Sequence, residues 1–577
     1  MSRASRALPA LLAVAVVVGA CTTEPEPSAS PTTRPESASP TRTVAVTDSP
    51  FSASSWPAAG SACNAPGYTG RIGRIEAVSA RTIRFRLCAP DGAFLARIAS
   101  PALGILDSAT IERLGADPGA ARSIAGTGPY RIDHWDEGGD AILVAAAAGS
   151  AAGRGAPSAS LTPTVILRWN ADPAQRAAEL QSASVDGIDA PGPAQIGALE
   201  TLPEVVMIPR AGLSTAYLAF GSDPAFDDVR VRRAIAGAVD RDALVDRAFP
   251  AGSTVATHLA PCQLAGACAG DDWYPFNGPA AAADLATAGF DLGATYALHV
   301  PDRPVPGLPD PRGLALALQA ALLDSIGLST TIDVMDVATW AARIADGGAD
   351  GLYLGGTGDG AVDAADVIAA TLGPDDTATP ARRAPDVAAA LASIAATADP
   401  GARQAGLKRA NDAIRSMVPL IPLAHAGSVT AFRADVTGVV TSPLGVDPLG
   451  SFTPGDRPQL VFMQGTDPGG AYCADRSSPD AYRACSLITE PLYRFAPGTM
   501  EVQPGLATRC TANGDASVWT CTLRQGVRFQ DDTQLDAGDV LATFAAQWNG
   551  RSAVRVARPA GSFAAWDALF GGTVDGG

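Results

Sequence analysis

The chain has 577 residues, of which 47% are hydrophobic and 18% are charged, and its formal net charge is −17. This length is sufficient for two to four domains. The acidic balance disfavours a nucleic acid as a partner and is compatible with a small-molecule or cationic ligand. Beyond the first residues, no apolar stretch of the sequence is long enough to span a bilayer.

The chain begins with a segment that is typical of bacterial export signals. Arg3 and Arg6 precede an apolar run over residues 8–20, which is too short for a stable membrane span. The run ends in Val-Gly-Ala-Cys at residues 18–21, which resembles the lipobox, where the cysteine is diacylated. We therefore expect residues 1–20 to be a lipoprotein signal peptide and Cys21 to carry the lipid. An ordinary cleaved signal with a chance cysteine is the alternative.

Residues 21–56 are expected to form a flexible tether. The stretch from Thr22 to Pro50 consists mostly of Thr, Ser, Pro, Glu, Ala and Arg and contains no aromatic residue. Such a segment cannot bury enough apolar surface to offset its ordering entropy. Because two acyl chains hold a protein stably at a membrane, we expect an extracytoplasmic protein anchored to the outer face of the cell membrane through Cys21.

The body alternates between patterns typical of strands and of helices, which favours an α/β architecture. Period-two or apolar runs predict strands at residues 82–87, 131–135, 164–169, 185–189, 217–220, 330–334, 350–354 and 419–423. Helical periodicity predicts helices at residues 174–184, 229–249, 279–290, 314–326 and 387–418. After Pro454 the sequence becomes rich in strand patterns again.

The chain contains nine cysteines. With Cys21 assigned to the lipid, an even number remains, and in an exported chain this indicates disulfides. Pairing of sequence neighbours is the simplest of the many possible connectivities and joins Cys63 to Cys88, Cys262 to Cys268, Cys473 to Cys485 and Cys510 to Cys521. A zinc site is the competing interpretation, which the missing CxxC motif and the scattered histidines disfavour.

Four motifs occur in a fixed order along the body. They are Gly126–Tyr130 (GTGPY) followed by Trp135, Val185–Asp189 (VDGID), Phe226–Ile235 (FDDVRVRRAI) continuing to Arg241, and Pro419–Pro422 (PLIP) followed by His425. Together they resemble family 5 of the bacterial solute-binding proteins, which comprises oligopeptide-, dipeptide- and nickel-binding receptors. The resemblance covers the body from about residue 70 to residue 430.

A second group of motifs similar to this family stands at the end of the chain. They are Glu490–Tyr493 (EPLY), Pro504–Ala507 (PGLA), Trp519–Phe529 (WTCTLRQGVRF) and Ala537–Val540 (AGDV). In the family the corresponding motifs lie near the N-terminus, so the resemblance implies a circular permutation with residues 441–457 as the joint between the old ends. Such a rearrangement needs old termini that lie close together. A tandem fusion of two incomplete receptors is the alternative, although the two groups of motifs complement each other without overlap.

The resemblance implies an α/β fold of the periplasmic-binding-protein type (class II), with two lobes of mixed sheets and flanking helices. The cleft between the lobes is expected to close by a hinge. Residues 57–215 are expected to form the first part of lobe 1, residues 216–430 lobe 2, and residues 431–577 the remainder of lobe 1. The resemblance further implies a monomeric receptor that delivers a peptide or similar small solute to the permease and ATPase subunits of an ABC importer.

A glycine-rich loop at residues 355–359 (Gly-Gly-Thr-Gly-Asp) matches the place where peptide-binding family members hold the ligand's α-ammonium group. Asp359 is therefore the first candidate ligand residue, because a buried ammonium needs an anionic partner, and Asp363 is the second. The loop departs from the family pattern, since Gly356 or Thr357 replaces a tryptophan. A solvated loop aspartate is the plainer alternative. A GxGxxA dinucleotide fingerprint at residues 356–361 is another, which the exported, acidic chain disfavours.

A second candidate stretch, Asp467–Tyr472 (DPGGAY), resembles the family segment that lines the cleft. Backbone groups of Gly469 and Gly470, with Tyr472 beside them, could pair with an extended peptide. A plain turn closed by a disulfide is the alternative. Arg303 is one of several arginines that could meet a ligand carboxylate.

Motifs of common enzymes are missing from the sequence, which has no GxSxG elbow, no HExxH and no Walker loop. We therefore expect a binding protein with no catalytic residue, no metal site and no cofactor. The alternatives are a receptor for another solute, such as an oligosaccharide or a nickel chelate, and a sensory or hydrolytic extracellular protein.

Overall fold

The computed structural model describes residues 51–136, 138–145, 162–345, 350–358, 360–372 and 385–575. These residues belong to one compact unit that begins at Asp48. The predicted signal peptide, Cys21 and most of the predicted tether lie outside the described residues. The end of the predicted tether range contains strand β1 (Ser54–Trp56), which pairs with β2 (Ile72–Ser79). Within the described ranges, no helix combines the length and the apolar character needed to cross a membrane.

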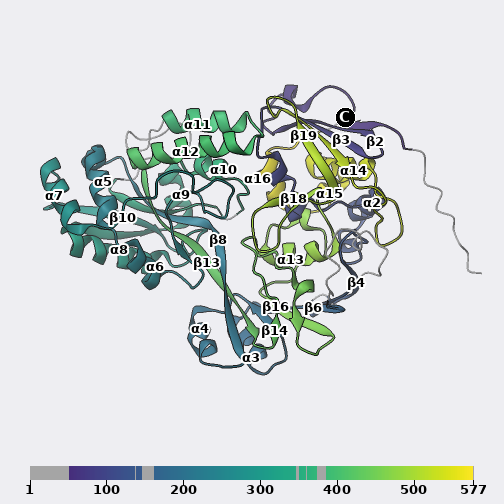
Figure 1. The fold of residues 1–577 in the computed structure, drawn as a ribbon, viewed down its shortest axis with the longest axis horizontal. Helices are drawn as coiled ribbons and strands as arrows, with labels where there is room; N and C mark the ends of the chain where they lie inside the picture. Colours follow the sequence, from purple (N-terminus) through teal and green to yellow (C-terminus); the bar gives the residue numbers. More distant parts are fainter. Residues whose placement is uncertain are drawn as a thin grey trace, which may run out of the picture. The chain divides into compact units, whose positions relative to one another are not determined.

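The two ends of the body build one sheet together (Figure 1). Its five strands are all antiparallel and follow the order β1, β2, β3 (Thr82–Leu87), β20 (Val518–Leu523) and β19 (Ala507–Ala512). In the central pair, Phe85 stands opposite Trp519. Phe94 lies 5.0 Å from Phe85 and 5.4 Å from Trp519 between ring centroids. This core of lobe 1 therefore depends on segments that are more than 400 residues apart in the sequence.

A second, mixed sheet contains eleven of the described strands. The order is β11 (Ser329–Met335), β10 (Thr295–Pro301), β12 (Leu352–Gly356), β8 (Val205–Phe220), β13 (Leu420–Arg433), β7 (Gly187–Asp189), β16 (Gln459–Gln464), β6 (Thr164–Trp169), β5 (Asp140–Ala145) and β4 (Tyr130–Trp135), with β9 (Thr254–Val255) paired to β13. Two short ribbons pair β14 (Val436–Thr437) with β15 (Thr453–Pro454) and β17 (Tyr493–Phe495) with β18 (Val502–Pro504).

Strands β8 and β13 are shared by the two lobes (Figure 1). Residues 216–220 of β8 pair with the start of β13 and with β12 in lobe 2. Residues 205–210 of β8 pair with the end of β13, which also pairs with β7 in lobe 1. Both strands therefore cross the boundaries expected near residues 215 and 430, and the register of the pair shifts between Pro422 and Ala424 and again between Ala426 and Ser428.

Helices cover the sheets of both lobes. Lobe 1 carries α1 (Phe94–Arg97), α2 (Ser108–Ala116), α3 (Pro173–Gln181), α4 (Pro193–Glu200), α13 (Pro479–Ile488), α14 (Ala537–Trp548), α15 (Ala553–Val556) and α16 (Ala564–Phe570). Lobe 2 carries α5 (Val229–Ala238), α6 (Arg241–Ala248), α7 (Gly278–Ala288), α8 (Pro311–Ile326), α9 (Val337–Ala345), α10 (Ala364–Leu372), α11 (Pro385–Ala395) and α12 (Pro400–Met417).

Two predicted helices are each divided in the structure. The helix expected at residues 229–249 ends at Ala238, and the side chain of Asp240 then caps α6 by accepting from the Ala243 N–H at 3.1 Å. The helix expected at residues 387–418 is divided before Pro400, where Asp399 accepts from the Ala402 N–H at 2.8 Å. In both cases an aspartate that competes for backbone donors starts a new helix, and apolar periodicity alone does not reveal that break.

Candidate functional site

The glycine-rich loop begins at the carboxyl end of β12, between β10 and β8. The Thr357 hydroxyl accepts from the Thr215 N–H at 2.8 Å, and the Thr357 N–H donates to the Thr215 carbonyl at 3.0 Å. Gly355 lies under the ring of Tyr217, because a Cβ there would come within 2.2 Å of ring carbons. The start of the loop is therefore fixed to β8, whereas Asp359 lies outside the described residues.

Asp363 closes this loop and directly precedes α10. Its carboxylate accepts from the Ala365 N–H at 3.0 Å and forms an ion pair with Arg403 of α12. The side chain is buried, and this burial raises the pKa of Asp363 although Arg403 opposes the shift. Both of these interactions lie inside lobe 2, so Asp363 fixes the helix that follows the loop.

Arg303 is exposed in the connection between β10 and α8. Strands β10 and β12 are parallel, so this connection and the glycine-rich loop lie at the same edge of the sheet. Gly307, at φ 81°, brings the connection against the loop: a Cβ there would lie 3.0 Å from the Gly356 Cα and from the Thr215 carbonyl oxygen. The structure thus brings the segment that carries Arg303 next to the segment that precedes Asp359.

The second candidate stretch follows the carboxyl end of β16 in lobe 1. Gly469, at φ 75°, covers the guanidinium of Arg476, and Gly470, at φ 128°, packs against the backbone of Ala121. The Ala471 N–H donates to the Ala121 carbonyl at 2.8 Å. The two glycines therefore permit close backbone packing at positions where a side chain would be strained.

Tyr472 points into lobe 1. Its ring is buried, and the guanidinium of Arg558 lies 4.9 Å from the ring centroid. Its hydroxyl has no hydrogen-bond partner among the described residues, and burial raises the pKa of Tyr472 above its ordinary value. The structure therefore places Tyr472 as packing support for the stretch, on the lobe opposite to the glycine-rich loop.

Strands β8 and β13 run side by side from one lobe into the other, and at this crossing between the lobes the backbones pack closely. A Cβ on Gly212 would lie 1.6 Å from the Ala426 carbonyl oxygen, and one on Gly427 would lie 2.1 Å from the Gly252 carbonyl oxygen. The Thr215 hydroxyl and His425 Nδ1 are 2.8 Å apart beside this crossing. Burial lowers the pKa of His425 to about 4, so its imidazole is neutral at pH 7.

A buried charge cluster in lobe 1, which sequence reasoning did not predict, lies below this crossing. Arg483 donates to Asp189 at 2.7 Å and to Asp447 at 3.3 Å, and Arg210 donates to the same two carboxylates at 2.7 and 2.5 Å. Burial raises the pKa of Asp189, but Arg483 and Arg210 outweigh it and hold this pKa well below its ordinary value. Asp447 belongs to the predicted joint 441–457, so this segment is anchored inside the lobe.

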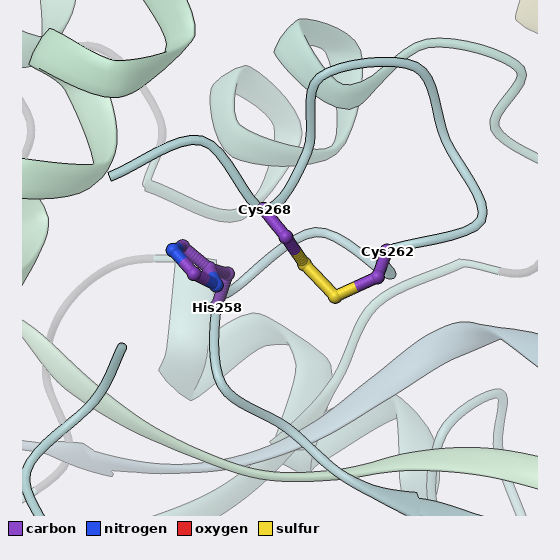
Figure 2. Close-up of side chains that lie close together, drawn as sticks. All are labelled: His258, Cys262 and Cys268. Carbon is purple, nitrogen blue, oxygen red and sulfur yellow. A yellow bond between two sulfur atoms is a disulfide. The ribbon is translucent and has the colours of Figure 1, made fainter. Parts of the chain in front are cut away.

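The predicted disulfide pairing is confirmed for all four pairs. Figure 2 shows one of them, Cys262–Cys268, beside the buried imidazole of His258. One ring nitrogen of His258 and the two sulfur atoms lie within 4.8 Å of one another. Both sulfur atoms are bonded to each other, so neither is the thiolate that binds metals. Burial lowers the pKa of His258, which keeps its imidazole neutral beside the disulfide.

A hollow of about 530 Å³ lies beside the Cys63–Cys88 disulfide. Its lining includes Arg71, Asp91 and Phe570. None of the predicted ligand residues that the structure describes contributes to this lining.

Comparison with known proteins places the chain among extracytoplasmic receptors. The family described as bacterial extracellular solute-binding proteins, family 5 Middle, matches residues 38–379 and 501–566. Heme-binding protein A of Haemophilus influenzae is 26% identical over 65% of this chain and 68% of its own length. The dipeptide-binding protein of Escherichia coli K12 is 24% identical over 65% of this chain and 70% of its own length. The solved structure of HbpA2 from Haemophilus parasuis is 25% identical, with a TM-score of 0.58 over 66% of this chain and 75% of that one.

Proposed function

This chain belongs to family 5 of the bacterial extracellular solute-binding proteins of ABC importers, and we propose that it captures short peptides and delivers them to an importer permease. The observation that carries this proposal is the position of the glycine-rich loop at the carboxyl edge of the lobe 2 sheet. The loop is held by Thr215 just above the crossing of the two shared strands. Ligands of open α/β sheets bind at such edges.

We assign the charged contacts of the ligand to lobe 2. The Asp359 carboxylate meets the α-ammonium group of the peptide, and Asp363 holds the following helix in place through Arg403. Arg303, at the same sheet edge, meets the ligand's carboxylate. A charge-assisted hydrogen bond in a desolvated cleft is the interaction that an ammonium or carboxylate group requires.

Lobe 1 supplies the opposite wall through the stretch that follows β16. Gly469 and Gly470 present backbone groups to an extended peptide, while Tyr472 supports them from behind by packing on Arg558. Backbone pairing gives affinity without dependence on side-chain sequence.

The chain start fits this role as a membrane anchor. In the proposal, residues 1–20 are removed, Cys21 carries the lipid, and the Pro- and Ser-rich tether lets a monomeric receptor reach the permease from the outer face of the membrane. Radiolabelled palmitate should be incorporated into the wild-type protein and not into Cys21→Ser, and this measurement tests the anchor.

We further propose that the chain is circularly permuted. The five-stranded sheet supports this, because β20 from the chain end is inserted between β19 and the N-terminal strand β3. The buried Asp447 supports it as well, since it anchors the segment that would join the old ends. A re-permuted chain that starts near residue 457 and joins residue 575 to residue 51, so that β1 is kept, should fold and bind like the wild type. Insolubility of that chain would count against the proposal.

A thermal-shift screen is the decisive test of the ligand class. Di- to octapeptides should raise the melting temperature of the purified protein, with a stabilisation of about 2.7 kcal/mol at a hundredfold excess over Kd. Asp359→Ala should abolish that shift, whereas Asp333→Ala, which alters an exposed strand residue at the far edge of the same lobe, should retain it. Shifts produced only by sugars or nickel chelates would overturn the peptide assignment.

Heme is the second candidate ligand, because one relative carries the name heme-binding protein A. Hemin therefore belongs in the same screen. A Soret-band shift on mixing with hemin, without any peptide-induced stabilisation, would favour heme over peptide.

A further inference from the structure

A small group of charged residues joins the two lobes at a second place, besides strands β8 and β13. Arg97 ends α1 in lobe 1, and its side chain is only 3% exposed. Its Nη1 and Nη2 atoms donate to the two carboxylate oxygens of Asp366 in lobe 2 at 2.6 and 3.0 Å. Its Nε atom donates to Asp91 of lobe 1 at 2.7 Å. One guanidinium therefore bridges a carboxylate from each lobe, with the bidentate geometry on the lobe 2 side.

The backbones of the two lobes meet beside this bridge. The Gly92 N–H in lobe 1 donates to the Ala395 carbonyl at the end of α11 in lobe 2, at 2.9 Å. A Cβ on Gly92 would lie 1.9 Å from the Thr397 carbonyl oxygen. The contact thus requires glycine at this position for steric reasons, and any side chain there would push the lobes apart.

Asp366 stands close to the candidate ligand loop in the sequence and in space. It is the third residue of α10, and Asp363, three residues earlier, closes the loop by capping the same helix. A second ion pair, between Asp363 and Arg403, holds this end of the loop to α12. The ion pair between Arg97 and Asp366 therefore holds α10, the helix that follows the loop.

The electrostatics of the group favour a contact that can open. Burial raises the pKa of Asp366, but Arg97 and then Arg71 outweigh it and keep the pKa below its ordinary value. The Asp366 carboxylate is 28% exposed and Arg71 is 45% exposed, so water can replace the lost partners when the lobes separate. An isolated buried carboxylate would not tolerate that loss.

We propose that Arg97 is a latch that stabilises the closed arrangement of the lobes and thereby positions the ligand loop without touching the ligand. This inference rests on the proposed function, because the loop serves as a ligand loop only there. Closure by the latch increases the fraction of the chain in the binding-competent state, which tightens the apparent affinity and slows dissociation.

Amide hydrogen exchange in the full, unliganded chain tests the latch directly. The Gly92 amide should be protected in the wild type and should exchange at least about tenfold faster in Asp366→Asn. Amides of β3 and β20 should stay unchanged and show that lobe 1 remains folded. The matched control is Asp91→Asn, which keeps the bidentate contact to Asp366 and should retain protection. An unprotected Gly92 amide in the wild type, or equal protection in Asp366→Asn, would overturn the latch.

A second variant opens the lobes without altering any charge. Gly92→Ala places a methyl group against Thr397, so it should raise the Kd for trialanine about tenfold through faster dissociation, as Asp366→Asn should. Asp91→Asn should change that Kd less than twofold. If both opening variants bind trialanine as the wild type does, Arg97 does not position the loop. Failure of the wild type to bind trialanine would count against the peptide assignment alone, because the hydrogen-exchange result needs no ligand.

Discussion

Two arginine–aspartate clusters of similar composition occupy different places in the molecule. Arg483 is fully buried in lobe 1, and its carboxylate partners Asp189, Asp447 and Asp480 are at most 13% exposed. Arg97 is almost as deeply buried, but its partner Asp366 belongs to the other lobe and is partly open to solvent. The partners of Arg483 can separate only if lobe 1 unfolds, whereas those of Arg97 can separate when the lobes open. An arginine–aspartate pair thus stabilises the fold of one lobe in the first place and forms a separable contact between the lobes in the second.

The largest effect should come from removing the charge of Arg483. Arg483→Met leaves Asp189 and Asp447 buried with only Arg210 between them, which should lower the free energy of unfolding by about 3–5 kcal/mol. Urea denaturation measures this change. The matched control is Arg131→Met, whose pair with Asp133 is about half exposed and should matter by less than about 0.5 kcal/mol. If the two variants were equally stable, the Arg483 cluster would contribute no more than an exposed ion pair, and the distinction between fixed and movable clusters would be lost.

A smaller effect is expected from the disulfide that holds the helix of Arg483. Cys473 and Cys485 close a short loop around the start of α13, and changing both to serine should cost about 2–4 kcal/mol of stability in the oxidised protein. The Cys262–Cys268 pair closes a still shorter loop in lobe 2, so the corresponding double variant should lose less. A larger loss for Cys262→Ser/Cys268→Ser would show that the Arg483 cluster alone fixes α13.

The smallest effect concerns the pH dependence of stability and contrasts Asp189 with Asp539, a carboxylate that has no arginine partner among the described residues. Asp189 keeps a pKa below its ordinary value, so its stabilisation is present at neutral pH and is lost as the pH falls below about 4. Burial raises the pKa of Asp539 to about 6, so its folded state favours the protonated form, and its contribution to stability is lost as the pH rises through 6. Melting curves between pH 4 and pH 7 should therefore fall more steeply for the wild type than for Asp539→Asn. Parallel curves would show that Asp539 titrates normally.

The sequence predicted most of the local structure, because its signals are local. The alternation at residues 82–87 and the apolar run at residues 164–169 correspond to β3 and β6 without change of bounds, and sequence neighbours among the cysteines are joined. The shared strands were foreseen only in part: β8 was expected at residues 217–220 but begins at Val205. Its first half contains Pro209 and Gly212, which interrupt a strand pattern, and Arg210, whose burial depends on β13 and Asp447 rather than on any local pattern.

Only those parts of the candidate site that resemble family motifs could be predicted from the sequence. The start of the glycine-rich loop and the segment with Arg303 lie side by side, as parallel neighbouring strands require. Asp363 and Tyr472 instead have supporting positions in their own lobes. No sequence signal indicated Arg97 or Asp366, since their pairing joins residues that are 269 positions apart and depends on how the two lobes meet.

The pair of strands that runs through both lobes has a mechanical consequence. Two hydrogen-bonded strands resist stretching and sliding, because either motion breaks several ladder bonds at once, whereas strands accommodate twist readily. Where β8 and β13 pass between the lobes, the register of the pair shifts twice, and Gly212 and Gly427 let the backbones touch. The link between the lobes therefore permits rotation of one lobe against the other more readily than translation.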